Sequence, residues 1–306
     1  MWLASAASAQ TLDLETPDFK LRLSKESQTV AALEPKSTPG FDFTPSDRLS
    51  QHTANRYHHL GDLILRVRAG SSGEWQKYDT AESRAPVDAL PATGSTLAAA
   101  NLSPTLPADV PLQITRSWIV DNGRLVLRFE LKNKTNQPVQ LGALGLPMVF
   151  NNILTGRSLK EAHDKCSFSD PYIGQDAGYL QVTRLNGAGP SLVVVPDGQT
   201  PFEGYQLLSE PTRPSQTFEG VFAWMVHTQA YAEDEWRNAV PWNPATLATI
   251  APGATRTYGV KFLLADEIRS IEKTLAQNNR PIAIGIPGYI LPMDVDGRLF
   301  IKHQQR

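Results

Sequence analysis

Apolar and polar side chains alternate most clearly between residues 112 and 152. A first apolar run leads from Leu112 to Val120, broken by Arg116, and Asn122-Gly123 separates it from a second run. Alternation with period two puts successive side chains on opposite faces of a strand. Asn-Gly between two such runs is the strongest short hairpin signal, because a type I′ turn needs positive φ at both central residues. The second run predicts an inner face made of Leu125, Leu127, Phe129 and Leu131.

Similar runs at residues 139–143 and 146–150 extend this pattern. We interpret residues 112–150 as an antiparallel meander with one buried face and one solvated face. Shorter apolar runs recur through most of the chain. The predicted fold class is therefore mainly β, as a large antiparallel two-sheet sandwich.

Two helices are expected. Ser158 followed by Glu161 forms a capping-box pattern that predicts a helix over residues 159–164. Residues 267–278 carry apolar side chains three and four positions apart, which predicts a short amphipathic helix near the C-terminus.

An apolar strand pattern continues to the end of the sequence at Arg306, so we expect the native chain to continue. The expected organisation is a leader (residues 1–11), a β-sandwich domain (12–265), and a helix and strand leading towards a further C-terminal region (266–306).

Composition narrows the function classes. The chain has 306 residues, 41% of them hydrophobic, which suffices for one large β domain or two smaller ones. The net charge of −2 and the scattered basic residues favour neither nucleic acid nor an anionic membrane as a partner. No stretch approaches the ~20 apolar residues of a membrane span. Cys166 is the only cysteine, so an intramolecular disulfide is impossible.

After Met1, Trp2 and Leu3, the chain begins with small residues only, which end in Ala7-Ser8-Ala9, a triplet that resembles a signal-peptide cleavage site. The basic region of a signal peptide is absent. We interpret the segment as the remnant of a signal peptide, with a disordered leader as the alternative, and expect a secreted, extracellular protein.

Two polar segments are candidate sugar sites. Glycoside hydrolysis uses two carboxyl groups, one protonated and one ionised. One segment is the acidic run Glu233-Asp234-Glu235, which lies among aromatic residues. Its structural alternative is a solvated acidic loop anchored by tryptophans. The other is a glycine-flanked polar loop, whose alternative is a loop that hydrogen-bonds its own backbone. The predicted substrate-binding residues are Asp170, Tyr172, Gln175, Asp176, Tyr231, Glu233, Glu235, Trp236 and Trp242.

Other catalytic patterns are weaker. His227 with Glu233 or Glu235 offers the acid and base of a mutarotase, although a histidine on an apolar strand is more often part of the core. His58, His59 and Asp62 look like a metal cluster, but adjacent strand residues point to opposite faces. The sequence has neither a Gly-rich phosphate loop nor a Gly-x-Ser-x-Gly elbow. We therefore expect no metal site and no cofactor.

Four segments, residues 144–152, 166–179, 231–236 and 252–262, resemble the amino-terminal β-sandwich region of an uncharacterised, mostly fungal, six-hairpin glycosidase-like family. The resemblance extends from about Leu12 to the end. It implies a sandwich like the galactose-mutarotase supersandwich, followed by an α/α-barrel that holds the catalytic acid and base. That barrel is missing from these 306 residues.

The resemblance implies a non-catalytic N-terminal domain of a secreted glycoside hydrolase, inactive alone, whose partners are carbohydrate and the missing barrel. A stand-alone aldose-mutarotase-like enzyme and a carbohydrate-binding module remain alternatives. Because loops on a rigid scaffold usually carry binding groups, we expect residues 169–176 and 231–243 to lie together at one end of the sandwich and face the barrel. At least one of Trp236 and Trp242 should then be partly exposed.

Overall fold

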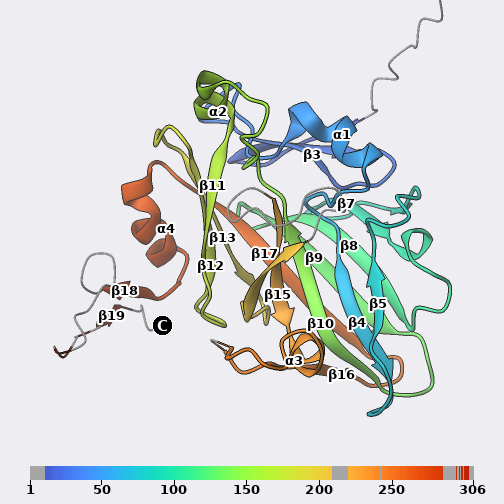
Figure 1. Ribbon diagram of the computed structural model, residues 1–306. Coiled ribbons are helices and arrows are strands. Elements are labelled where there is room, and N and C mark those ends of the chain that lie inside the picture. The colour runs from blue at the N-terminus through green and yellow to red at the C-terminus, as the bar shows by residue number, and fades with distance from the viewer. Residues whose placement is uncertain are drawn as a thin grey trace, which may run out of the picture.

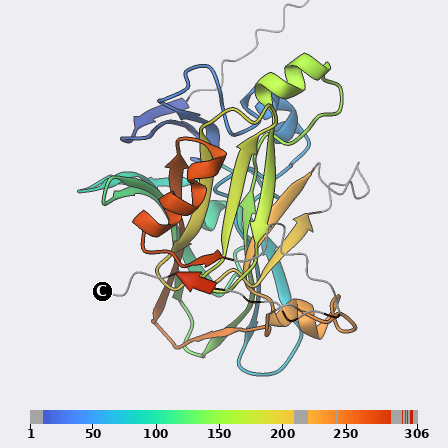
Figure 2. The same cartoon turned by 90° about the vertical axis from the view of Figure 1, so that its left-hand side faces the viewer.

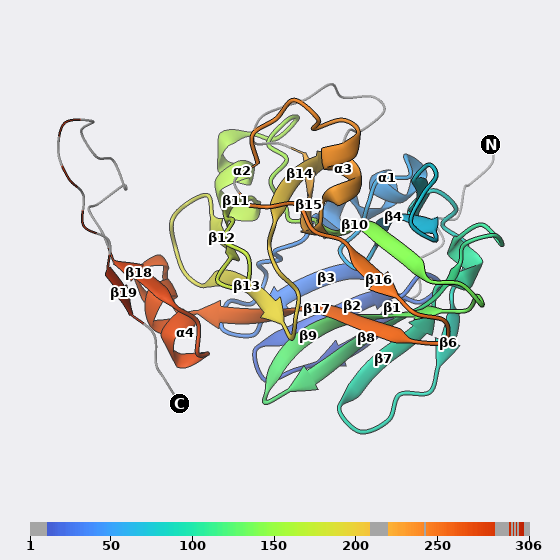
Figure 3. The same cartoon turned by 90° about the horizontal axis from the view of Figure 1, so that it is seen from below.

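The computed structural model describes residues 11–208, 220–241 and 243–284, together with Asp294, Asp296, Arg298 and residues 300–302. Within this part of the chain, two large antiparallel sheets stack face to face (Figure 1). Seen from below in Figure 3, they form two separate layers. The predicted mainly β, two-sheet sandwich is therefore confirmed.

The larger sheet joins two groups of strands that are consecutive in sequence. Strands β6 to β9 form one half, β11 to β13 form the other, and β17 pairs with both β9 and β13. A late segment thus closes the sheet. Across the sheet, the eight strands are β11 (Ser167–Tyr172), β12 (Tyr179–Arg184), β13 (Ser191–Asp197), β17 (Thr255–Ala265), β9 (Arg124–Asn133), β8 (Leu112–Asp121), β7 (Thr96–Asn101) and β6 (Asp88–Leu90).

The smaller sheet is built around β10, which pairs with β4 on one side and with β15 and β16 on the other. Its strands are β14 (Gly204–Leu208), β15 (Val221–His227), β10 (Val139–Met148), β4 (Ile64–Ala69), β5 (Gln76–Asp79) and β16 (Ala248–Ile250). Two further sheets consist of β1 (Thr11–Glu15), β2 (Phe19–Ser24) and β3 (Val30–Pro35), and of β18 (Ile282–Ile284) and β19 (Phe300–Lys302).

The predicted hairpin is present between β8 and β9. Asn122 and Gly123 both have positive φ, 48° and 77°, as a type I′ turn requires. The four residues predicted for the inner face are at most 1% exposed and belong to the core between the two large sheets. Arg116 interrupts the apolar pattern because its guanidinium, although buried, donates to the backbone oxygens of Gly61 (2.6 Å) and Ser27. Burial lowers the pKa of Arg116 to about 10.

The predicted meander is wrong after β9. Residues 139–148 form one continuous strand, β10, and this strand lies in the other sheet. Nearly all its side chains are buried, so the two faces cannot be told apart by polarity. Register shifts between Leu141 and Ala143 and between Leu144 and Gly145 disturb the period further. The short polar segment before Val139 is therefore a crossover between sheets, and not a tight turn.

Both predicted helices are present. Ser158 and Glu161 form the capping box of α2 (Leu159–Lys165). In the C-terminal helical segment, a 3-10 turn (Ile268–Ser270) leads into α4 (Ile271–Gln277). Ile271 and Leu275 of α4 pack on the outer face of β13 and β17. Two more helices, α1 (Leu49–Ala54) and α3 (Gln229–Glu233), and two 3-10 turns, Ser46–Arg48 and Ser103–Thr105, complete these elements.

No helix in the described ranges has both the length and the apolar character needed to cross a membrane. The proposed leader lies outside the described residues, except for Thr11, which begins β1. The boundary proposed after Ala265 coincides with the end of β17. Since α4 packs against the sandwich, the division into two regions stays a prediction.

Candidate functional site

Helix α3 carries the first group of predicted site residues and lies on the outer face of the smaller sheet, at the lower end in Figure 1. Its Ala230 and Tyr231 pack with Ala143, Ala223 and Met225. Two alanines at this point of β10 and β15 leave space for the tyrosine ring, which is only 7% exposed. The sheet surface, and not intrinsic helix propensity, therefore determines where this five-residue helix settles.

Arg66 of β4 holds the helix from the side of the sheet. Its guanidinium makes a bidentate ion pair with Glu235, with nitrogen–oxygen distances of 2.6 and 2.5 Å. It also lies 3.8 Å from the centre of the Tyr231 ring, and that ring stacks on Trp236 at 4.8 Å. Hydrogen bonds from Arg66 lower the pKa of Glu235 to about 2. Glu235 is consequently an ionised anchor and cannot serve as a general acid.

Glu233 is fixed in a similar way by Trp75 and Arg68. Its carboxylate accepts hydrogen bonds from Gln229 (3.0 Å), Trp75 Nε1 (2.7 Å) and Arg68 (3.2 Å). These donors lower the pKa of Glu233. The Trp75 ring is packed against Gly142 of β10, where an added Cβ would lie 2.3 Å from a ring carbon.

The charges of this region balance. Three carboxylates, from Glu233, Asp234 and Glu235, face three cations, from Arg66, Arg68 and Lys77. The outermost pair is the most exposed: the side chains of Lys77 and Asp234 are 60% and 58% exposed. We call these charged residues and the three aromatic residues packed with them the α3 cluster, which has nine members: Arg66, Arg68, Trp75, Lys77, Tyr231, Glu233, Asp234, Glu235 and Trp236.

The second group of predicted residues occupies the β11–β12 hairpin. The segment predicted as a polar loop is a strand as far as Tyr172, because its backbone pairs with that of β12. Asp170 stands opposite Gln181 within the ladder, and the Gln181 amide approaches its carboxylate at 3.4 Å. Gln175 and Asp176 lie in the turn, where Gln175 has a positive φ of 53°. The Asp176 backbone oxygen accepts a hydrogen bond from Arg280.

Both groups lie at the same end of the sandwich, and residues 202–204 connect them (Figure 1). Gln175 and Phe202 exchange two backbone hydrogen bonds, of 3.1 and 2.9 Å. Two residues later, the Cβ position of Gly204 is 3.6 Å from the Trp236 ring. Trp236 is half-buried, whereas Trp242 lies outside the described residues. The turn of the hairpin and α3 are thus neighbours.

Beneath α3, a chain of buried hydrogen bonds connects the two sheets. With Glu203 ionised, the Thr246 hydroxyl donates to its Oε1, so that hydroxyl must accept from His227 Nδ1 at 2.7 Å. His227 Nε2 then carries no proton and accepts from the Tyr258 hydroxyl at 2.9 Å. Thr228, the residue before α3, donates to Glu203 at 2.8 Å. Burial raises the pKa of Glu203, although hydrogen bonds from both threonines oppose it.

These hydrogen bonds decide between the two sequence interpretations of His227, in favour of a core residue. The histidine bonds to Thr246 and Tyr258, and not to Glu233 or Glu235. It is 8% exposed, and burial lowers its pKa to about 4. His227 is therefore a neutral core histidine in a fixed tautomer.

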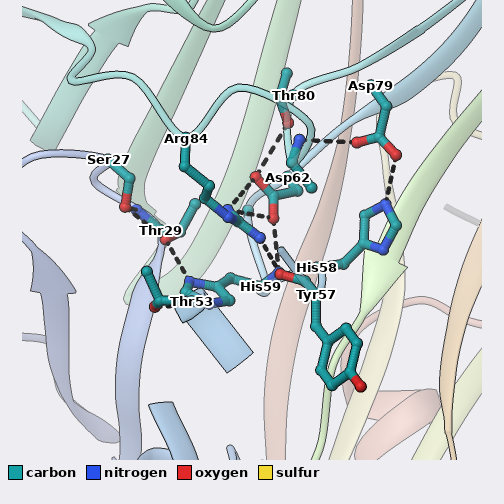
Figure 4. A network of polar contacts seen from close by, with 12 residues as sticks. Ser27, Thr29, Thr53, Tyr57, His58, His59, Asp62, Asp79, Thr80 and Arg84 are labelled. Atoms are coloured by element: carbon teal, nitrogen blue, oxygen red, sulfur yellow. Dashed lines mark hydrogen bonds and ion pairs between the residues drawn. The ribbon is translucent and has the colours of Figure 1, made fainter. Parts of the chain in front are cut away.

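A further polar network fills the space between residues 57–62 and β5 (Figure 4). His58 bonds to Asp79 at 2.7 Å, whereas the ring of His59 turns to Thr29 at 3.0 Å. The two adjacent histidines thus point to different partners, as expected, although they lie in the segment between α1 and β4 and not on a strand. Burial, with the nearby charge of Arg84, lowers the pKa of His59 to about 3.

Asp62 sits at the centre of Figure 4 and is 2% exposed. Its carboxylate accepts from the backbone of His59 (2.6 Å) and from Thr80 (3.0 Å), and it pairs with Arg84 at 2.8 Å. Burial opposes its ionisation, yet Arg84 and the neighbouring histidines lower its pKa. This network ties β5 to the core, although the buried Nε of Arg84 has no hydrogen-bond partner in it. Across the described ranges, no cluster of three His, Cys, Asp or Glu residues is arranged to hold a metal ion.

Sequence reasoning missed the sheet residues that define the site. Arg66 and Arg68 alternate with buried residues of β4, so their outward direction is readable from the pattern. Their partners lie about 165 positions later, at Glu233 and Glu235. Nothing in the local sequence gives that pairing. Glu203 has no local signal either, because it immediately precedes a strand of intermediate burial.

The sequence pattern of one known family, a family of unknown function called DUF5695, matches residues 22–306. The chain belongs to this family. No curated protein matches its sequence. Membership in this family extends over β2 to β19 and thus over both large sheets, but it names no activity.

Solved structures identify the fold of this DUF5695 member. A polysaccharide lyase superposes with a TM-score of 0.65 at 13% identity, over 96% of this chain and 44% of the lyase. A galactose mutarotase-like protein from Clostridium acetobutylicum superposes with a TM-score of 0.51 at 7% identity, over 84% of this chain and 95% of that protein. The Slr1438 protein from Synechocystis sp. PCC 6803 gives 0.52 at 13% identity, over 87% and 100%.

At these identities the similarity establishes the fold alone, which is the expected galactose mutarotase-like sandwich. The chain spans less than half the length of the lyase. The alignment covers nearly all of the Clostridium acetobutylicum protein and of Slr1438. The comparisons are thus compatible with both arrangements of this sandwich, within a longer enzyme and as a protein of its own size.

Proposed function

We propose that the chain is the non-catalytic β-sandwich domain of a secreted carbohydrate-active enzyme, a glycoside hydrolase. It packs on an α/α-barrel domain, which carries the acid and the base, and its α3 end helps to shape the sugar site. Two things support a role beside a larger catalytic domain: the superposition on part of a polysaccharide lyase and the resemblance to six-hairpin glycosidase-like proteins.

The observation that carries the proposal is the state of the exposed carboxylates in the α3 cluster. Hydrolysis requires one carboxyl group that is protonated and can donate. Glu235, with a pKa of about 2, and Glu233, with a lowered pKa, are both ionised and held by sheet residues. Glu203 has a raised pKa, but it is 6% exposed and occupied by Thr228 and Thr246. Among the described residues, Glu233, Glu235 and Glu203 therefore offer no accessible acid for cleaving a sugar, whereas the ionised carboxylates of the α3 end can bind and orient one.

The mutarotase alternative needs a histidine acid that reaches the substrate. His227 does not meet this requirement, because it is buried and both of its ring nitrogens are bonded. The carbohydrate-binding alternative is compatible with the same geometry and differs only in lacking a catalytic partner.

The test compares this chain with a longer protein that also contains the following helical domain. We expect no turnover of aryl glycosides or polysaccharides by the chain alone, and turnover by the longer protein. In the longer protein, Trp236→Ala should raise KM for the polysaccharide while changing the stability of the chain little, since Trp236 is half-buried at the surface.

Three results would contradict the proposal. If the chain alone hydrolyses a glycoside and Glu235→Gln abolishes this activity, the catalytic site would lie in the α3 cluster of this domain. Aldose anomerisation that disappears in His227→Ala would support the mutarotase alternative. Sugar binding by the chain with no catalytic activity in any longer gene product would leave only a binding module.

A further inference from the structure

A pocket of about 410 Å³ lies away from the α3 cluster, where the turn of the β11–β12 hairpin meets α4 and β18. Figure 2 faces this side of the molecule, with α4 in front of the sandwich. The volume is within the range of small-ligand sites, about 300–1,000 Å³. Most of the described lining is apolar, including Ile173, Leu275, Pro281 and Ile282.

Two tyrosines form an aromatic wall of this pocket. Tyr172 and Tyr179 are directly opposite each other at the ends of β11 and β12. Their rings stack in parallel, with centres 4.5 Å apart and planes 6° apart. The pair holds both rings in one orientation, and Tyr172 remains 38% exposed. A rigid, partly exposed aromatic ring offers an apolar surface to the C–H face of a pyranose.

The hairpin turn behind the tyrosines is fixed by close packing. An added Cβ at Gly178 would lie 2.8 Å from Phe202 Cβ and 2.9 Å from the Gly174 nitrogen. The Arg280 guanidinium binds the Asp176 backbone oxygen and so ties the segment after α4 to the turn. The two sides of the pocket are thus connected to each other, as a preformed binding site requires.

The charge of the pocket selects among sugars. Glu272, in the first turn of α4, is the one charged side chain among the described lining residues. A carboxylate accepts hydrogen bonds from sugar hydroxyls. It repels the carboxylate of a uronic acid, for which the described lining residues include no lysine or arginine.

We propose that this pocket binds a neutral pyranose oligosaccharide through stacking on Tyr172 and hydrogen bonding to Glu272. The site is separate from the α3 cluster, and the proposal rests on the proposed carbohydrate role of the chain. Binding here would hold a polysaccharide on the domain at a distance from the catalytic centre of the barrel.

Isothermal titration calorimetry on the full 306-residue chain tests this proposal. The probes are cellohexaose, xylohexaose and mannohexaose, with hexagalacturonate as the acidic counterpart. We expect at least one neutral hexaose to bind and hexagalacturonate to bind at least about tenfold more weakly, a difference of about 1.4 kcal/mol. Tyr172→Ala should weaken the neutral complex about tenfold, and Glu272→Gln should weaken it and reduce the discrimination against hexagalacturonate.

Phe168→Ala is the matched control. Phe168 is an exposed aromatic residue (47%) on the same strand and does not line the pocket, so its loss should leave affinity unchanged. Circular dichroism of each variant separates lost binding from lost folding, and Glu272→Gln covers the case in which Tyr172→Ala does not fold.

The proposal is overturned if none of the three neutral hexaoses binds, if hexagalacturonate binds as tightly, or if folded Tyr172→Ala and Glu272→Gln bind as the unaltered chain does. Its failure is distinguishable from failure of the proposed function. If the longer protein turns over polysaccharide and Tyr172→Ala leaves this turnover unchanged, the result would contradict the role of the pocket and support the catalytic partner domain. Turnover by the chain alone would contradict the proposed partner domain and would not bear on binding in the pocket.

Discussion

At the scale of single residues, burial and partners decide what each titratable group can do. In sequence, Glu235 was a predicted sugar-binding residue, and together with His227 it offered the base and acid of the weaker mutarotase alternative. Arg66 lowers the pKa of the first to about 2, and burial lowers that of the second to about 4. Each is therefore held in one protonation state at neutral pH, which favours an anchoring role over proton transfer.

The buried histidines predict how stability depends on pH. In the unfolded chain a histidine takes up a proton near its usual pKa of ~6.5. In the folded protein, His227 and His59 stay neutral until about pH 4 and about pH 3. The contribution of these two histidines to the free energy of unfolding is therefore complete above the pKa of the unfolded chain, and it is lost as pH falls towards the folded pKa. We expect the free energy of unfolding to decrease by about 1.4 kcal/mol per pH unit for each histidine between ~6.5 and the folded pKa.

Urea unfolding at a series of pH values measures this slope. His227→Gln should reduce the slope by the contribution of one histidine, because the glutamine side chain does not titrate. An unchanged slope in this variant would mean that His227 is already protonated in the folded protein, against the fixed tautomer inferred from Thr246 and Tyr258.

At the scale of elements, α3 is held by the sheet beneath it. Five residues are too few for a stable isolated helix. Arg66 and Arg68 of β4 and Trp75 before β5 supply the missing contacts. The same contacts position Trp236, the predicted sugar-binding ring, through its stack on Tyr231.

Removing one anchor should release α3 without unfolding the sandwich. In Arg66→Met we expect faster tryptic cleavage after Arg237 and a loss of roughly 1 kcal/mol in the free energy of unfolding, since the freed Glu235 can be hydrated. Lys77→Met is the control. Lys77 is 60% exposed and 3.6 Å from Glu235, so cleavage and stability should stay close to those of the unaltered chain. Equal cleavage rates in the two variants would contradict the anchoring role of Arg66.

At the scale of the whole molecule, the two sheets are joined by one apolar core. Residues from β4, β10 and β15 meet residues from β9, β13 and β17 within a single cluster. The buried chain from Glu203 through His227 to Tyr258 adds a polar connection between the layers. Loss of a central side chain should therefore weaken the entire sandwich in a single transition.

Phe129 tests this because it is completely buried at the centre of the larger sheet. Phe129→Ala should lower the free energy of unfolding by about 3–5 kcal/mol, since the lost apolar contacts leave a cavity. Leu159→Ala, at a helix position that is 75% exposed, should change it by less than about 0.5 kcal/mol. Chemical denaturation followed by tryptophan fluorescence compares the two. A loss below about 1 kcal/mol for Phe129→Ala would contradict the shared core.

The sequence by itself determined the features that depend on near neighbours in the chain. Asn122-Gly123 specified its turn, Ser158 with Glu161 specified the start of α2, and the alternation in β9 specified its inner face. Turn geometry, capping and strand alternation act over a few residues, so their signals are local.

Only the tertiary structure decided which strands share a sheet and which side chains meet. The pattern of β10 has no polar face because both of its sides are covered, so its place in the second sheet is not encoded locally. The pairs Arg66 with Glu235 and His227 with Tyr258 join residues far apart in sequence. Their protonation states depend on burial and on those partners, and both exist only once the two sheets have packed.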